Sequence, residues 1–278
     1  MASKEDTPAY IMDTSDEITR LSYNHALFKD AMGGNLVLAP IDFSSGPKRI
    51  LDSATADGLW LRDLAATCPV DHEFTGTDIN PAQFPKDSVA NFSYRVQDVH
   101  GDWPVDWNSR FDLVHQRLGL AASGPRTQDV VKNMARLVRP GGWIQFVEAD
   151  DHESSDAGPM WKQNMILFRD LFKAMGSRYS SGDEIAGWLR DVGFEDVEEK
   201  VFGLRFGALN PNEELARKGV ISSRLGLQQL CAIAKTFPPG AISLSHEELD
   251  RLPVEGPLET EKQGHIMYMR AVWGRQRA

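Results

Sequence analysis

Apolar and polar positions along residues 48–149 predict strands that are separated by helices or loops. Apolar residues at three- and four-residue spacing predict helices over residues 59–65 and 128–138. Short apolar runs that end in turn residues predict strands at residues 50–52, 73–79, 92–99, 111–116 and 143–149. This order is typical of an open, mostly parallel sheet in an α/β protein.

The rest of the chain has a more helical pattern. Ser15 can cap a helix that the apolar spacing extends to Gly33. Beyond residue 150 the pattern predicts helices at 160–175, 182–191 and 210–238, and strands at 194–206 and 265–273. We therefore expect one domain over residues 1–278, with an N-terminal helical cap (1–47), a ligand-binding core (48–150), and helical lid elements with the final strands (151–278).

The segment from Lys48 to Ala65 carries the clearest chemical signal. Its apolar strand runs into Asp52, and small residues then lead through Gly58 into a helix. Small residues let the backbone approach a ligand closely, and the first turn of a helix offers free N–H groups. Asp78 ends the next predicted strand, and the carboxyl ends of parallel strands share one edge of a sheet. This pattern predicts a site for a nucleotide-like ligand at that edge.

Composition narrows the possible functions. The formal net charge is −10 and no basic stretch is present, which disfavours nucleic acid as a partner. No apolar run approaches the roughly 20 residues that span a bilayer, and the N-terminus lacks a signal-peptide core, so we expect a cytoplasmic protein away from membranes. Cys68 and Cys231 match no zinc or redox spacing, and we expect buried thiols and no metal site.

Taken together, the motifs resemble those of class I S-adenosylmethionine-dependent methyltransferases. Within that class they resemble the fungal secondary-metabolism group that includes the global regulator of toxin clusters and small-molecule thiol methyltransferases. The matching segments are ILDSATADGLWL, TDINPAQFP, VQDV, FDLVHQR, LVRPGGWIQFVE and GHIMYMRAVWG. The resemblance implies a Rossmann-like, mostly parallel sheet, an N-terminal helical segment, inserted helices that form a substrate lid, and S-adenosyl-L-methionine as cofactor.

The resemblance also implies a role for individual residues. Asp52 stands near the methionine portion of the cofactor, and Asp78 stands where a carboxylate accepts hydrogen bonds from the ribose hydroxyls. Asp98 stands where the adenine is bound, and His115 lies beside the reacting end and is the predicted catalytic residue. The implied cofactor-binding set is Asp52, Ser53, Ala54, Gly58, Asp78, Ile79, Asp98, Val99, His115, Gln116 and Arg117.

The turn after Asp52 departs from the family pattern. The family has three glycines there, whereas this chain has Ala54, Ala56 and Gly58. Alanine disfavours positive φ, which predicts weaker cofactor binding or a reshaped turn.

Each assignment has a structural alternative. Asp52 and Asp78 would also serve as caps of helices or turns, and His115 would also suit a structural role on a buried strand. The apolar residues of the predicted helix at 160–175 would suit either core packing or contact with a flat, apolar metabolite. For substrate contact we expect Met165, Phe168 and Phe172.

The predicted reaction is methyl transfer to a small-molecule secondary metabolite. A thiol acceptor is favoured, as in the enzymes that S-methylate dithiol metabolites of the gliotoxin type, because a thiol with a pKa of about 8.5 needs little base. A hydroxyl or amine acceptor would need a general base such as His115. The alternatives are O- or N-methylation, a methyltransferase-fold regulator acting through protein partners, and a non-methylating use of the cofactor.

Overall fold

The computed structural model describes residues 15–87, 89–152 and 157–278, and the chain divides into two compact units. The sheet unit contains Lys29–His152, Met175–Leu204 and Met267–Ala278. Of the described residues, the helical unit contains 15–28, 157–174 and 205–266. Residues 1–14 of the expected helical cap lie outside the described residues. Each unit combines segments that lie far apart in the sequence.

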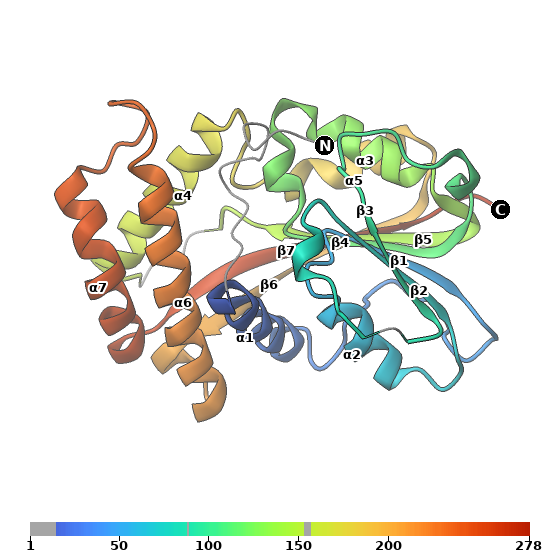
Figure 1. The fold of residues 1–278 in the computed structure, drawn as a ribbon, viewed down its shortest axis with the longest axis horizontal. Helices are drawn as coiled ribbons and strands as arrows, with labels where there is room; N and C mark the ends of the chain where they lie inside the picture. The colour runs from blue at the N-terminus through green and yellow to red at the C-terminus, as the bar shows by residue number, and fades with distance from the viewer. Residues whose placement is uncertain (1–14, 88, 153–156) are drawn as a thin grey trace. The chain divides into compact units, whose positions relative to one another are not determined.

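A mostly parallel sheet forms the sheet unit, as predicted. Within the described residues it has seven strands in the order β3-β2-β1-β4-β5-β7-β6 (Figure 1). Strands β1 to β5 pair in parallel, whereas β7 runs antiparallel to β5. The strands are β1 (Arg49–Ser53), β2 (Glu73–Asp78), β3 (Phe92–Val96), β4 (Phe111–Arg117), β5 (Val138–Ala149), β6 (Glu195–Phe206) and β7 (His265–Arg275).

Helices of the sheet unit cover both faces of its sheet. Figure 1 shows α2 (Leu59–Thr67) on one face and α3 (Thr127–Ala135) with α5 (Gly182–Asp191) on the other. The apolar sides of α3 and α5 pack against Val114, Ile144 and Phe146 of the central strands. Helices on both faces explain why β4 and the second half of β5 are buried almost throughout, and they leave the strand ends as the accessible edge.

The predicted boundary between α3 and β5 is wrong. The helix expected over residues 128–138 ends at Ala135, and the expected stop at residues 140–142 lies inside β5. Backbone bonds from Gly141 N–H to Gln276 O and from Gln276 N–H to Gly142 O, both 2.9 Å, continue the pairing of β5 with the C-terminal segment. Gly141 adopts a φ of 75° within this strand. Pairing with a distant segment therefore overrides the local turn signal of proline and glycine.

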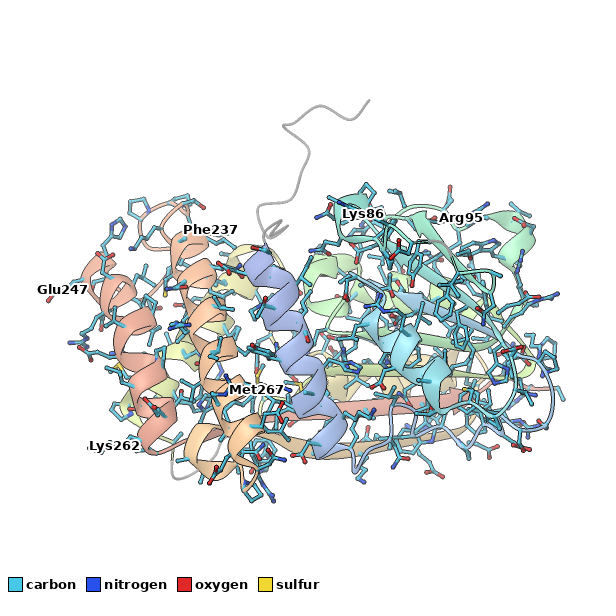
Figure 2. The ribbon with its side chains drawn as sticks, turned by 60° about the horizontal axis from the view of Figure 1, so that its bottom comes forward. Lys86, Arg95, Phe237, Glu247, Lys262 and Met267 are labelled. Carbon is cyan, nitrogen blue, oxygen red and sulfur yellow. The ribbon has the colours of Figure 1, made fainter. Side chains whose placement is uncertain are left out.

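The helical unit is built around three packed helices. These are α4 (Pro159–Ala174), α6 (Glu213–Ala234) and α7 (His246–Lys262), and Figure 2 shows α6 beside α7, with Glu247 and Lys262 labelled near the ends of α7. Helix α1 (Ser15–Ala31) begins in this unit, where Ser222 of α6 hydrogen-bonds Asn24 at 2.5 Å. The core is formed by Leu167, Leu171, Leu227, Cys231, Ala234, Leu244, Leu249 and Leu252. Cys231 is buried as expected, whereas Cys68 of the sheet unit is only half-buried.

Polar and aromatic contacts fix the start of α4. The carboxylate of Glu259 on α7 accepts the N–H groups of Met160 at 3.1 Å and Trp161 at 2.9 Å. The rings of Trp161 and Phe206 both stack on the imidazole of His265. The distances between ring centroids are 3.8 Å for Trp161 and 4.7 Å for Phe206. Burial lowers the pKa of His265 to about 3, so its ring stays neutral near pH 7. These contacts orient the face of α4 that carries the predicted substrate residues.

Candidate cofactor and active site

The carboxyl ends of β1, β2 and β4 bring several predicted site residues to one edge of the sheet. Asp52 stands opposite His115 in the pairing of β1 with β4, and Ser53 stands opposite Gln116. Asp78 ends β2, the neighbour of β1 on its other side. Ligands of open α/β sheets bind outside the carboxyl ends of the strands, at the point where the strand order reverses, which here lies between β1 and β4.

The turn after β1 keeps the backbone shape of a glycine turn although two of its residues are alanines. Ala54 has a φ of 55°, Ala56 a φ of 50° and Gly58 a φ of 71°. The N–H of Ala56 donates to Asp78 Oδ2 at 2.9 Å, and the N–H of Thr55 donates to Thr77 O at 2.9 Å. The left-handed region costs a non-glycine residue roughly 1–2 kcal/mol. Bonds from β2 thus hold the alanines in a conformation that they disfavour.

Close packing explains why the third small position is a glycine. A Cβ on Gly58 would lie 2.6 Å from Cε1 of Tyr94, which projects from β3. A Cβ on Gly76 of β2 would lie 2.8 Å from both Tyr94 and Thr55. Tyr94 therefore packs over the turn, a contact that sequence spacing alone does not reveal.

Replacing both Ala54 and Ala56 with glycine is expected to stabilise the protein. The relief of backbone strain exceeds the roughly 0.5–1 kcal/mol that glycine loses through its greater freedom in the unfolded chain, which leaves a net gain of about 1 kcal/mol. A gain of this size raises Tm by roughly 2–4 °C in a protein of this length. Thermal unfolding without cofactor measures it. The matched control, Ala66→Gly at an exposed position of α2, should lower Tm, and an equal fall in the double variant would contradict the role of backbone strain.

A buried hydrogen-bonded network surrounds Asp52. Its Oδ1 lies 2.7 Å from His115 Nδ1, and its Oδ2 accepts from Thr55 Oγ1 at 2.7 Å. The His115 ring stacks on Trp60 at 3.8 Å, with 2° between the planes, and is 1% exposed. Burial lowers the pKa of His115, so a neutral ring that carries its proton on Nδ1 donates to Asp52. The contact with Asp52 fixes the orientation of the His115 ring, and its Nε2 has no hydrogen-bond partner among the described residues. The role of His115 as a base stays a prediction.

The second acid, Asp78, is positioned to accept hydroxyl groups. Its Oδ2 takes the N–H of Ala56, and its Oδ1 takes the N–H of Asn80 at 3.0 Å. Burial raises the pKa of Asp78, while these backbone donors lower it in part. Each carboxylate oxygen keeps a lone pair for a further donor. Ile79, the next residue, is 38% exposed and offers an apolar surface beside the acid.

The other predicted cofactor residues lie after β3 and at the end of β4. Asp98 is exposed and accepts the N–H of His100 at 2.9 Å, so its carboxylate also caps a local turn, and Val99 packs against the sheet core. Gln116 donates to Ser53 Oγ at 3.1 Å. Burial lowers the pKa of Arg117 to about 10, partly offset by the nearby carboxylates of β1 and its turn, so its guanidinium is charged near pH 7.

This edge fits S-adenosylmethionine. The ribose hydroxyls of that cofactor need acceptors, and Asp78 at the end of β2 has lone pairs left for such donors. Buried side-chain atoms at the same strand ends or the turns that follow them include four without a partner among the described residues: Thr77 Oγ1, Asn80 Nδ2, His115 Nε2 and Gln116 Oε1. Buried polar atoms are normally paired, so such atoms are typical of a site that binds a ligand.

The three predicted substrate residues belong to α4 in the helical unit. Met165, Phe168 and Phe172 follow one another at three- and four-residue spacing and therefore lie on one face of the helix. Met165 is buried, and the two phenylalanines are half-buried. The structure thus groups these residues as the sequence pattern suggested.

Metal-binding and membrane-spanning features are absent from the part of the chain that the structure describes. Across residues 15–87, 89–152 and 157–278, no three His, Cys, Asp or Glu side chains gather as a metal site would require. Over the same ranges, no helix has both the length and the apolar character to cross a bilayer.

Similarity to known proteins shows the family to which this chain belongs. The methyltransferase domain family matches residues 23–199. N-methyltransferase sirN of Leptosphaeria maculans is 34% identical over 97% of this chain and 95% of its own length. N-methyltransferase tcpN of Claviceps purpurea is 36% identical over 94% of each chain, and N-methyltransferase gliN of Aspergillus fumigatus is 31% identical over 96% of each.

Solved structures show the same fold. Phosphoethanolamine N-methyltransferase 2 of Haemonchus contortus, in complex with S-adenosyl-L-methionine, aligns with a TM-score of 0.51 and 16% identity, covering 92% of this chain and 53% of its own. A putative methyltransferase in complex with the Trm112 activator of Haloferax volcanii aligns with a TM-score of 0.53 and 13% identity, covering 96% and 100%. The chain therefore belongs to the class I methyltransferase family and is an S-adenosylmethionine-dependent methyltransferase of fungal secondary metabolism.

Proposed function

We propose that this enzyme methylates a nitrogen atom of a small-molecule secondary metabolite. The supporting observation is that sirN, tcpN and gliN, which each align with at least 94% of this chain, are all named N-methyltransferases. The sequence by itself favours a thiol acceptor, with nitrogen as an alternative. The names of these relatives support the nitrogen alternative.

The proposed cofactor contacts follow from the strand ends. Asp78 accepts the ribose hydroxyls, with Ile79 beside the adenine, and Asp52 orients the turn of residues 54–58 against the methionine portion. Asp98 and Val99 contact the adenine, and the remaining contacts come from Ser53, Ala54, Gly58, His115, Gln116 and Arg117. The bound cofactor supplies an already activated methyl group, so these residues mainly bind and orient.

We further propose that the face of α4 that carries Met165, Phe168 and Phe172 contacts the apolar part of the acceptor. Phe168→Ala is expected to raise KM for the acceptor about tenfold, because a buried aromatic contact contributes roughly 1.5–3 kcal/mol. Steady-state kinetics at saturating cofactor measure this change. Ile166→Ala on the exposed side of α4 is the matched control. An unchanged KM in Phe168→Ala would place the acceptor elsewhere.

A matched pair of acceptors tests the choice between nitrogen and sulfur. The first is a cyclic dipeptide whose two thiols are already S-methylated, which leaves an amide N–H. The second is the N-methylated dithiol, which leaves only the thiols. Mass spectrometry with S-adenosylmethionine should show one added methyl group on the first acceptor and none on the second. Methylation of the second acceptor alone would contradict the proposal and support thiol transfer.

A further inference from the structure

Glu148, near the carboxyl end of β5, is a buried acid that the contacts above do not use. Its side chain is 2% exposed. Its Oε1 accepts the N–H of Gly119 at 3.1 Å and of Leu120 at 3.0 Å, whereas its Oε2 accepts no hydrogen bond from the described residues. Both donors belong to the turn that directly follows Arg117 at the end of β4. Glu148 therefore lies at the same strand-end edge as the cofactor site, with one oxygen available.

The turn that holds Glu148 has a fixed shape. Leu118 adopts a left-handed φ of 56°, and its N–H donates to Val147 O at 2.9 Å. A Cβ on Gly119 would lie 2.6 Å from Cδ of Gln116, so the backbone passes close to that side chain. Two backbone donors on Oε1 and this turn fix the orientation of the carboxyl group.

No cation neutralises Glu148 among the described residues. Arg270 stands opposite it in the pairing of β5 with β7, but binds Asp150 at 2.7 Å and Glu199 at 2.6 Å. Burial raises the pKa of Glu148 to about 8, which the two N–H donors lower only in part. The elements around Glu148 carry these charged or titratable groups: Asp112, His115 and Arg117 on β4; Arg126, Asp129 and Lys132 in the turn and helix α3 that follow; Arg139 on β5 and Asp150 after it; Asp183, Glu184, Arg190 and Asp191 on α5; and Tyr268, Arg270 and Arg275 on the paired part of β7.

We propose that Glu148 Oε2 accepts the proton that the substrate nitrogen loses as it is methylated, an inference that rests on the nitrogen acceptor proposed above. The nitrogen lone pair forms the bond to the methyl carbon while the carbon–sulfur bond breaks and its electron pair returns to sulfur. The N–H electron pair stays on nitrogen, and the proton moves to the carboxylate. The products are the N-methylated metabolite, the thioether and a neutral Glu148, so charge and atoms balance.

The environment of Glu148 suits this task better than that of His115. A buried carboxylate is a stronger base than an exposed one, and an effective general base has its pKa near the working pH. His115 keeps Nε2 without a partner among the described residues, but its Nδ1 is engaged by Asp52 and one ring face is covered by Trp60. Its neutral form is further favoured by burial, which weakens it as a base.

The test replaces Glu148 with glutamine. The amide oxygen can still accept from Gly119 and Leu120, but it cannot take up the proton. With the S-methylated cyclic dipeptide, Glu148→Gln is expected to lower kcat about 100-fold while leaving KM and the affinity for S-adenosylhomocysteine within about twofold. The wild-type kcat should rise as pH rises through about 8, and this dependence should vanish in the variant. Glu198→Gln, an exposed position on β6, is the matched control and should behave as wild type.

A second measurement needs no turnover. Infrared spectroscopy of the cofactor-free protein should show a protonated carboxyl band at pH 7 that titrates near pH 8 and is missing in Glu148→Gln. In the folded chain Glu148 keeps its proton up to a pH of about 8, whereas an unfolded glutamate loses its proton above a pKa of about 4.3. The unfolding equilibrium should therefore shift toward the unfolded state as pH rises from 4.3 to 8, by up to about tenfold per pH unit, and the variant should lack this shift.

Several results would overturn the inference. Wild-type kcat and pH dependence in Glu148→Gln would exclude a proton acceptor, and loss of cofactor affinity or folding would indicate only a positioning role. A Glu148 carboxyl group that titrates in the ordinary range of glutamate would also exclude its role as the proton acceptor. If wild type fails to methylate the S-methylated probe, the nitrogen acceptor itself is wrong, and the infrared titration still reports separately on Glu148.

Discussion

Asp78→Ala is expected to weaken binding of S-adenosylhomocysteine at least 100-fold in calorimetric titration. Each hydrogen bond to a charged group contributes about 1.5–3 kcal/mol, and the carboxylate is proposed to accept two ribose hydroxyls. Asp78 also accepts the N–H of Ala56 at 2.9 Å, so its loss releases the left-handed turn. Both effects act in the same direction, which makes this the largest change in affinity that we expect from one substitution.

A ribose analogue separates the two effects. S-Adenosylhomocysteine that lacks the 2′-hydroxyl should bind wild type about tenfold more weakly than the normal ligand, because one charged hydrogen bond is lost. Asp78→Ala should bind both ligands with equal affinity, because the substitution and the loss of the 2′-hydroxyl remove the same hydrogen bond. If the analogue loses as much affinity in the variant as in wild type, Asp78 does not bind that hydroxyl. Its role would then be to hold the turn.

Asp52→Ala is expected to cause the largest loss of stability. The substitution leaves the Nδ1–H of His115 and the hydroxyl of Thr55 without their acceptor in the protein interior. Buried donors without acceptors cost roughly 1–3 kcal/mol each, so the free energy of unfolding should fall by about 3 kcal/mol. This corresponds to a fall in Tm of roughly 6–12 °C, measured by thermal unfolding.

Two comparisons make the Asp52 result specific. Asp71→Ala, at an exposed position before β2, should change the free energy of unfolding by no more than about 0.5 kcal/mol. His115→Phe keeps a ring against Trp60 and removes the donor, so Asp52→Ala should cost less in that background than in wild type. Equal costs in both backgrounds would show that the contact of Asp52 with His115 contributes nothing to stability.

Local pattern was sufficient to predict most of the sheet. Strands β1, β2 and β4 and helix α5 lie within two residues of their predicted positions, because apolar runs and turn residues mark both of their ends. The third strand is shorter than predicted and ends at Val96, so Asp98 and Val99 follow it as turn residues. The sequence pattern wrongly predicts a turn at residues 140–142. Pairing with Gln276 extends β5 through this segment.

The acidic residues of the site could be predicted from the sequence, but the hydrogen bonds that join distant residues could not. Asp52 and Asp78 follow apolar strands, which is a sequence signal, whereas the bond from Ala56 to Asp78 joins residues 22 apart. The left-handed φ of Ala54 contradicts the preference of alanine and is visible only in the structure. Gln145 is another example, because its buried side chain accepts the N–H groups of Leu38 at 2.6 Å and Ala39 at 3.2 Å from a distant segment.

The base and the acceptor atom required different information. Glu148 ends the matching segment LVRPGGWIQFVE, but no role followed from that match. Its significance comes from burial and from the N–H groups of the turn after β4. His115 attracted attention because histidine is the usual base near neutral pH, but its stack on Trp60 is not readable from spacing. Neither fold nor site distinguishes nitrogen from sulfur as acceptor, and the named relatives supply that distinction.

One measurement tests the proposed nitrogen transfer most directly. The protein would be incubated with S-adenosylmethionine labelled with carbon-13 in its methyl group, together with a cyclic dipeptide that carries both free thiols and an amide N–H. Carbon-13 NMR of the product distinguishes a methyl on nitrogen from a methyl on sulfur. We expect the label on nitrogen, in agreement with the named relatives. A label on sulfur alone would contradict the proposed function and the role of Glu148 together.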